Sequence, residues 1–112
     1  MIGTQFKWSR TEKVLARRVF DKAYKREMED LTNGVRAMLA DNADGRAIWR
    51  IQECLSEQRY ATDNKYDYRY SVLISVFGRL LGEGRIHATD IEGLGEDKLE
   101  QIRSIADFIR KR

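Results

Sequence analysis

One segment restricts the fold of this chain more than any other: a long amphipathic run that begins at Ser9. Ser9 and Glu12 have the spacing of a capping box, in which each side chain accepts a hydrogen bond from the other residue's amide. Apolar residues then recur every three or four positions, close to the seam of a coiled coil, at Phe20, Tyr24, Met28, Leu31, Val35 and Met38. A helix of roughly thirty residues is ~45 Å long, and the rest of a 112-residue chain is too short to cover it. We therefore expect a second subunit to contact part of this stripe, namely Met28, Leu31, Val35 and Met38.

Helices are also expected in the rest of the chain, because proline is absent and only glycines and polar clusters interrupt the apolar repeats. Residues 41–45 predict a chain reversal, after which Asn42 or Asp44 caps a second helix. Residues 62–64 predict another break, followed by a third helix with apolar positions at Tyr66, Tyr70, Leu73, Phe77 and Leu80.

The C-terminal part is expected to contain a short helical turn at residues 89–92 and a last helix. The inward residues of that last helix are expected to be Leu99, Ile102, Ile105 and Ile109. The sequence thus predicts a single all-α domain over residues 1–112, with a long N-terminal helix plus three to four shorter helices, in a dimeric helical assembly.

Composition argues against several classes of protein. Cys54 is the only cysteine and His87 the only histidine, so the sequence offers no internal disulfide, no soft-ligand metal cluster and no Cys/His motif for catalysis. We expect no enzymatic activity, no cofactor, no metal and no small-molecule substrate. No stretch approaches the ~20 apolar residues of a membrane span, so we expect a soluble cytoplasmic protein without membrane insertion. The net charge of +3 weakly favours an acidic partner.

Residues 91–95 (IEGLG) suggest an alternative function, because they resemble the turn of a helix-hairpin-helix element. In that element a Gly-hydrophobe-Gly turn directs backbone amides at a DNA phosphate, and Lys98 would be the natural phosphate partner here. Three acidic residues crowd the same turn and would repel phosphate: Glu92, Glu96 and Asp97. A tight turn between two helices is the favoured interpretation, and a small DNA-binding protein is the alternative.

Three tyrosines, Tyr66, Tyr68 and Tyr70, lie beside Lys65 and Arg69 and could stack single-stranded nucleic acid. On a helix Tyr66 and Tyr70 would share one face while Tyr68 points elsewhere. A core position for two of them is therefore the favoured interpretation, and nucleic acid is an unlikely partner.

The second helix carries the strongest signal for an interface. Trp49, Arg50, Glu53 and Arg59 combine a large ring with both charges, and Trp and Arg are the residue types that most often anchor protein interfaces. A tryptophan packed against the first helix, with surface ion pairs beside it, explains the spacing equally well. The sequence leaves both interpretations open.

Residues 48–59 (IWRIQECLSEQR) and 63–67 (DNKYD) resemble the signature of the cyanobacterial fluorescence recovery protein family. The similarity extends over nearly the whole chain, through residues 8–9 (WS), 20–27 (FDKAYKRE), 71–77 (SVLISVF), 80–84 (LLGEG) and 97–98 (DK). The order and spacing of these motifs together carry the resemblance.

The resemblance implies an all-helical homodimer that is accessory to the orange carotenoid protein. Members of the family bind the photoactivated red form, promote its return to the resting orange form and help detach it from phycobilisomes, without chemistry by their side chains. A location peripheral to the thylakoid, through a phycobilisome-associated partner, would follow. By this resemblance Trp49 and Arg59 match residues of the functional patch, and Ile48 occupies an apolar subunit-contact position.

The sequence departs from the family pattern at several positions, and several of these belong to the surface expected to contact the carotenoid protein. Gln52 replaces a characteristic histidine, Glu53 replaces aspartate, Ser75 stands where an aromatic is common, and Gln101 where a basic residue can be. The expected partner-binding residues are Trp49, Arg50, Gln52, Glu53 and Arg59, and the expected dimer contacts add Ile48 and Trp49 to the stripe on the first helix. A homologue with a different protein client is the remaining alternative.

Overall fold

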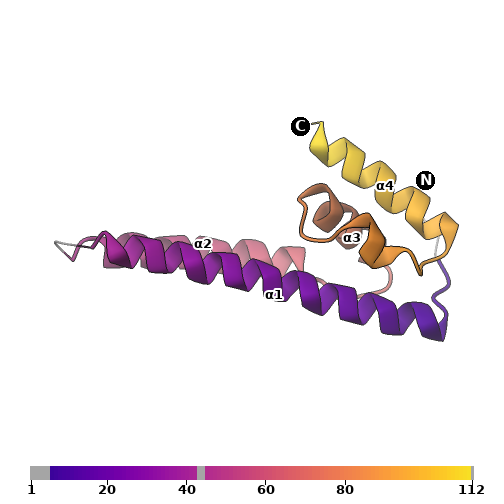
Figure 1. Cartoon of the computed structure of the whole chain (residues 1–112), viewed down its shortest axis with the longest axis horizontal. Helices are drawn as coiled ribbons and strands as arrows, with labels where there is room; N and C mark the ends of the chain where they lie inside the picture. The colour runs from indigo at the N-terminus through magenta and orange to yellow at the C-terminus, as the bar shows by residue number, and fades with distance from the viewer. Residues whose placement is uncertain (1–5, 43–44, 112) are drawn as a thin grey trace.

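The computed structural model describes residues 6–42 and 45–111, and its elements are all helical. They are α1 (Arg10–Ala40), α2 (Ala47–Lys65), α3 (Leu73–Gly82), the 3-10 turn η1 (Ala88–Ile91) and α4 (Glu96–Arg110). In Figure 1, α1 and α2 lie side by side as a hairpin, which we call the stalk, while α3, η1 and α4 form a head over the N-terminal half of α1. The described residues extend over 54 × 26 × 22 Å. The predicted all-α class is confirmed.

The start of α1 is fixed by the predicted capping box. The Glu12 amide donates to the Ser9 hydroxyl at 3.1 Å, and the Ser9 amide donates to the Glu12 carboxylate at 2.9 Å. Two amides that lack a helical partner are thereby satisfied. The helix then continues for 31 residues, as the long apolar stripe predicts.

The core lies mainly in the head, where α3 and α4 pack closely against each other and side chains of α1 complete the cluster. Glycines allow the close approach: a Cβ atom at Gly78 would lie 2.5 Å from Ile105 Cγ2. The buried apolar side chains of this cluster come from α1, from every helix of the head and from the segments between those helices: Ala16, Val19, Phe20, Ala23, Leu73, Val76, Phe77, Leu80, Leu81, Ile86, Ile91, Leu94, Leu99, Ile102 and Ala106.

The chain reverses after α1, where a cap was predicted. The N-cap residue of α2 is Arg46 rather than Asn42 or Asp44, but the Asn42 side-chain oxygen accepts a hydrogen bond from the Ala47 amide, the first of α2, at 3.0 Å. Asp44, the other predicted cap, lies outside the described residues. Gly45 has a φ of 81°, a left-handed conformation that favours glycine and completes the turn.

The third helix differs from the prediction. We expected a break at residues 62–64 and a helix that includes Tyr66 and Tyr70, but α2 continues through Lys65 and α3 begins only at Leu73. The intervening tyrosines pack instead on α1: the rings of Tyr66 and Tyr68 lie edge-to-face on Phe20, with centroids 5.4 and 4.9 Å away. Tertiary packing has therefore overridden the local periodicity, and the tyrosines do not share a helix face.

A network of charges joins the stalk to the head, and we call it the joint. Lys65 Nζ, which is buried, lies 2.7 Å from a Glu27 carboxylate oxygen and 2.9 Å from one of Glu83. Glu27 also accepts a hydrogen bond from the Tyr66 hydroxyl at 2.7 Å and pairs with Arg85 at 3.6 Å. Because most of these groups are shielded from water, the stability of each charge depends on its partners. The network fixes the end of α2 to the middle of α1.

The last part of the chain matches its prediction closely. The helical turn η1 begins at Ala88, one residue earlier than expected, because the Asp90 carboxylate accepts a hydrogen bond from the His87 amide at 2.8 Å. In α4, Leu99 and Ile102 are buried, as predicted. Ile105 and Ile109 are partly buried on the same face.

Candidate protein-binding surface

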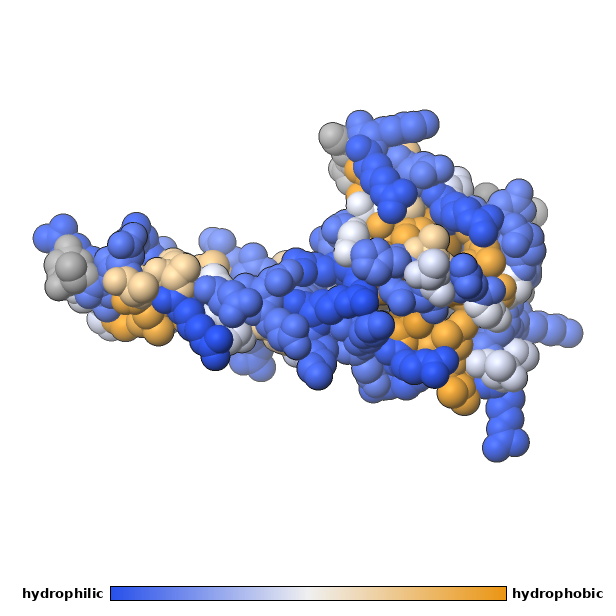
Figure 2. All heavy atoms as spheres, viewed as in Figure 1, coloured by the Kyte–Doolittle hydropathy of each residue, from blue (hydrophilic) through white to orange (hydrophobic). Residues whose placement is uncertain are grey.

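Trp49 lies near the free end of the stalk and points away from the core. Its side chain is 71% exposed, and the neighbouring Ile48 is 46% exposed. Leu39, at the end of α1, is also exposed, and Figure 2 shows apolar side chains gathered at this end of the molecule. Of the two interpretations that the sequence left open for Trp49, packing against the first helix is therefore wrong for this chain.

The other expected partner-binding residues are all exposed on α2. Helix geometry places Ile48, Gln52 and Arg59 along one line, at intervals of four and seven residues, and Trp49 with Glu53 along the adjacent line. Arg59 is about 15 Å from Trp49 along the helix axis. Two neighbouring lines of one helix thus bring five of the expected residues onto a continuous surface.

Arg50 is the exception among the expected residues. At about 100° per residue it falls on the opposite flank of α2 from Gln52 and Arg59. Sequence reasoning also missed Tyr60, which is 75% exposed and follows Trp49 by eleven residues, so that both rings project from the same side of α2. The eleven-residue spacing was the signal that could have identified it.

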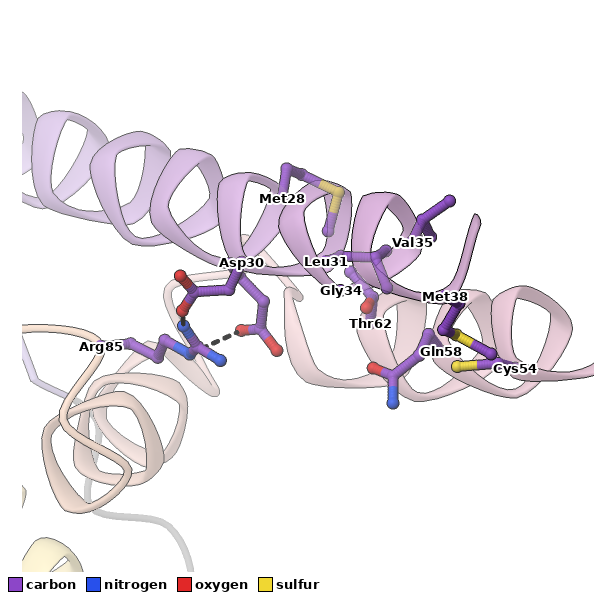
Figure 3. Close-up of a pocket in the computed structure, with 11 residues that line it drawn as sticks. Met28, Asp30, Leu31, Gly34, Val35, Met38, Cys54, Gln58, Thr62 and Arg85 are labelled. Atoms are coloured by element: carbon purple, nitrogen blue, oxygen red, sulfur yellow. Dashed lines mark hydrogen bonds and ion pairs between the residues drawn. The ribbon is translucent and has the colours of Figure 1, made fainter. Parts of the chain in front are cut away.

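The stripe on α1 that was predicted to contact a second subunit borders a groove of about 240 Å³ between the two stalk helices. Figure 3 shows Leu31 and Met38 directed toward α2, with Met38 beside Cys54, while Met28 and Val35 lie along the rim. All four residues of the stripe are only partly buried. Ile48 and Trp49 do not line this groove, so the residues expected at the dimer interface fall into two groups.

Cys54 and His87, the residues considered for catalysis, lie in different environments. Cys54 is a free cysteine that lines the stalk groove, and His87 is exposed at the start of η1. Across residues 6–42 and 45–111, no group of three or more His, Cys, Asp or Glu side chains is placed to hold a metal ion. No helix in the same ranges is long and apolar enough to cross a membrane.

The turn at Gly95, on which the DNA-binding alternative depends, is occupied from within the chain. The Gly95 amide donates to a Glu12 carboxylate oxygen at 2.7 Å, and Lys98 Nζ donates to the same carboxylate at 3.1 Å. These are the two donors that would have contacted a phosphate. Since an internal carboxylate already takes them, the structure does not favour the DNA-binding alternative.

The Glu12 carboxyl is strongly acidic in this setting. Burial by itself would raise its pKa, but hydrogen bonds from the amides of Ser9 and Gly95 and from Lys98 outweigh burial and lower the pKa to about 2. Glu12 is therefore ionised at neutral pH, and it ties the start of α1 to the start of α4.

The structure combines a helical stalk that exposes a tryptophan and apolar side chains with buried charges that are paired within the chain. This is the architecture of a protein-binding molecule. The sequence model of one family, described as photoprotection regulator fluorescence recovery protein, matches residues 8–106. The chain belongs to this family, as the resemblance of its motifs predicted. It is thereby placed among regulators of photoprotection.

Individual relatives are similar to this chain over nearly its whole length. The fluorescence recovery protein of Synechocystis sp. is 37% identical over 99 residues, which are 88% of this chain and 91% of the relative. The solved structure of the Fremyella diplosiphon fluorescence recovery protein is 40% identical and superposes with a TM-score of 0.84, covering 90% of this chain and 99% of that one. The solved Synechocystis structure gives a TM-score of 0.85 at 37% identity, with the same two shares covered.

Proposed function

We propose that this chain binds the photoactivated red form of an orange carotenoid protein, accelerates its return to the resting orange form and so ends phycobilisome quenching. The observation that carries the proposal is the 71% exposure of Trp49 on a helix whose neighbouring positions are also open, in a chain that belongs to the family. An exposed tryptophan beside apolar and charged groups is typical of the centre of a protein interface.

Such a role requires no reacting side chain. A partner that contacts one domain arrangement of its client more strongly than another shifts the population of the two, and contacts made during closure lower the barrier between them. The surface formed by Trp49, Gln52, Glu53 and Arg59 would supply these contacts.

The test is a recovery assay. A purified orange carotenoid protein is photoactivated, transferred to darkness and followed by absorbance with and without this chain. We expect the red-to-orange rate to rise with added protein and to saturate. Equal rates with and without the chain, at concentrations well above those of the client, would refute the proposal and favour a different protein client.

The possibility of a different protein client rests on four positions of the sequence. Gln52, Glu53, Ser75 and Gln101 all differ from the family pattern, and all four side chains are exposed, so none of them is needed for the core. Substitutions confined to an exposed surface alter what a protein binds more than how it folds.

We further propose that the chain is a homodimer in solution. The stalk groove, bordered by Met28, Leu31, Val35 and Met38, leaves apolar side chains partly open to water, and Leu39 and Ile48 add exposed apolar area at the stalk end. Contiguous apolar surface of this kind is uncommon on monomers and is readily covered by a second copy.

Replacing Ile48 with lysine is expected to shift this dimer toward monomer, raising the dissociation constant about tenfold or more. The lysine would have to lose water inside an apolar contact, while in the single chain the position is 46% exposed and tolerates a charge. Light scattering over a concentration series measures the change. Ser104→Lys, which adds the same charge on the exposed side of α4, should leave the dimer intact. An unchanged dissociation constant for Ile48→Lys would remove this residue from the interface.

A further inference from the structure

A second hollow lies on the stalk, between α1, α2 and the tyrosine that follows α2. Its volume is about 560 Å³, within the range of roughly 300–1,000 Å³ typical of binding pockets. The lining residues combine three aromatic rings with two carboxylates and one guanidinium: Phe20, Tyr24 and Tyr66, then Asp21 and Asp63, then Arg17. Thr62 completes the set.

The hollow continues the candidate protein-binding surface toward the head. Asp63 follows Arg59 by four residues, one turn further along α2, and their side chains form an ion pair at 3.9 Å. A client that covers Arg59 would therefore also cover the mouth of this hollow.

The aromatic walls are suited to a cation. Tyr66 stands edge-to-face against both Phe20 and Tyr24, with centroids 5.4 and 5.2 Å away. The planes of neighbouring rings are therefore nearly perpendicular, and the walls of the hollow include both ring faces and ring edges. Phe20 already lies near a cation, because the Arg17 guanidinium is 5.7 Å from its centroid and 4.7 Å from that of Tyr68, a neighbouring ring that does not line the hollow. Tyr24 is 42% exposed, which leaves room for a further contact.

Each of the two carboxylates of the hollow pairs with an arginine of its own helix, and both pairs are exposed. Asp21 pairs with Arg17 at 3.3 Å and Asp63 with Arg59 at 3.9 Å, and all four side chains are more than half exposed. Ion pairs this exposed contribute little to stability, because water screens both charges. An incoming cation therefore loses little by displacing one of them.

We propose that this hollow receives an arginine or lysine side chain of the protein client. The inference rests on the proposed function, since the client is the protein that covers Arg59. The client's cation lies against Tyr24 and Tyr66 and pairs with Asp63. Arg59, released from Asp63, then becomes free to meet a carboxylate of the client, so binding exchanges one internal pair for two pairs across the interface.

The first test uses the client. Asp63→Asn keeps the shape of the side chain and removes its charge, and we expect it to weaken binding of the photoactivated carotenoid protein about five- to tenfold. Glu57→Gln makes the same chemical change at an exposed position on the other side of α2 and should bind as the wild type does. If the wild type binds and Asp63→Asn binds equally well, the inference is overturned while the proposed function stands.

The second test needs no client. N-acetylarginine amide and the neutral isostere N-acetylcitrulline amide are titrated into the protein, and the ring protons of Tyr24 and Tyr66 are followed by NMR. We expect shifts with the arginine probe only, and their loss in Asp63→Asn. Equal responses to both probes would overturn the inference. Selective shifts in a protein that fails to bind the carotenoid protein would support a cation site and refute the proposed client.

Discussion

Replacing Glu12 with glutamine is expected to destabilise the folded chain by about 3–5 kcal/mol, the usual effect of leaving a buried charge without its partner. The Lys98 side chain is only 4% exposed, and its Nζ lies 3.1 Å from the Glu12 carboxylate. The amides of Ser9 and Gly95 donate to different oxygens of the carboxylate, so a glutamine, with one side-chain oxygen, keeps only one of these hydrogen bonds and cannot offset the ammonium charge. Urea denaturation followed by far-ultraviolet circular dichroism measures the change.

Two further variants make this test specific. Glu100→Gln, at an exposed position of α4, should change the stability by less than about 0.5 kcal/mol. Combining Glu12→Gln with Lys98→Met removes the unpaired charge, so the double variant should recover much of the loss. Equal denaturation midpoints for Glu12→Gln and Glu100→Gln would show that the pair contributes nothing to stability.

Lowering the pH should destabilise the unmodified protein in the same way, because acid neutralises the Glu12 carboxylate. Since the pKa of Glu12 falls from its ordinary 4.5 to about 2 on folding, its ionised form stabilises the folded state by about 3 kcal/mol. This contribution is fully present above about pH 5 and is lost as the pH falls toward 2. Over that interval Glu12→Gln should lose less stability than the wild type.

Truncating Trp49 to alanine is expected to weaken client binding by about thirtyfold or more, corresponding to the roughly 2 kcal/mol of an interface hot spot. Because 71% of this side chain is already in water, the free energy of unfolding should change by less than about 1 kcal/mol. The recovery assay at graded protein concentrations gives the affinity, and light scattering reports separately on the dimer.

A matched control exists for this variant. Phe108 is also a largely exposed aromatic, but it lies on α4 in the head, away from the stalk end. Phe108→Ala should therefore retain recovery activity. If both variants, or neither, lost activity, the surface around Trp49 would not be the one that contacts the client.

Much of the fold could be predicted because its signals are local. The capping box at Ser9, the turn at Asn42 and the buried face of α4 each depend on residues within a few positions of one another. The segment after Lys65 could not be predicted in this way. Its tyrosines follow a helical period, but they are held by Phe20, more than forty positions away.

The candidate site likewise has features with a local signal, which could be predicted, and features that depend on distant residues, which could not. Residue type and spacing identified Trp49 and Arg59, but spacing could not decide whether the indole was buried, since α2 carries apolar residues on several sides. The hollow beside Asp63 was missed because its walls come from α1 and from Tyr66 as well as from α2. The Glu12–Lys98 pair spans 86 positions and left no local signal.

The joint at Lys65 holds one end of α2, and Trp49 lies near the other end. Trp49 lies sixteen residues before Lys65 on α2, which is a lever arm of about 24 Å. A tilt of about 10° at the joint would move the indole by about 4 Å, close to one atomic contact distance. Since the ion pairs of Lys65 with Glu27 and Glu83 fix one end of α2, we expect a change in these charges to displace a side chain at the other end of the same helix.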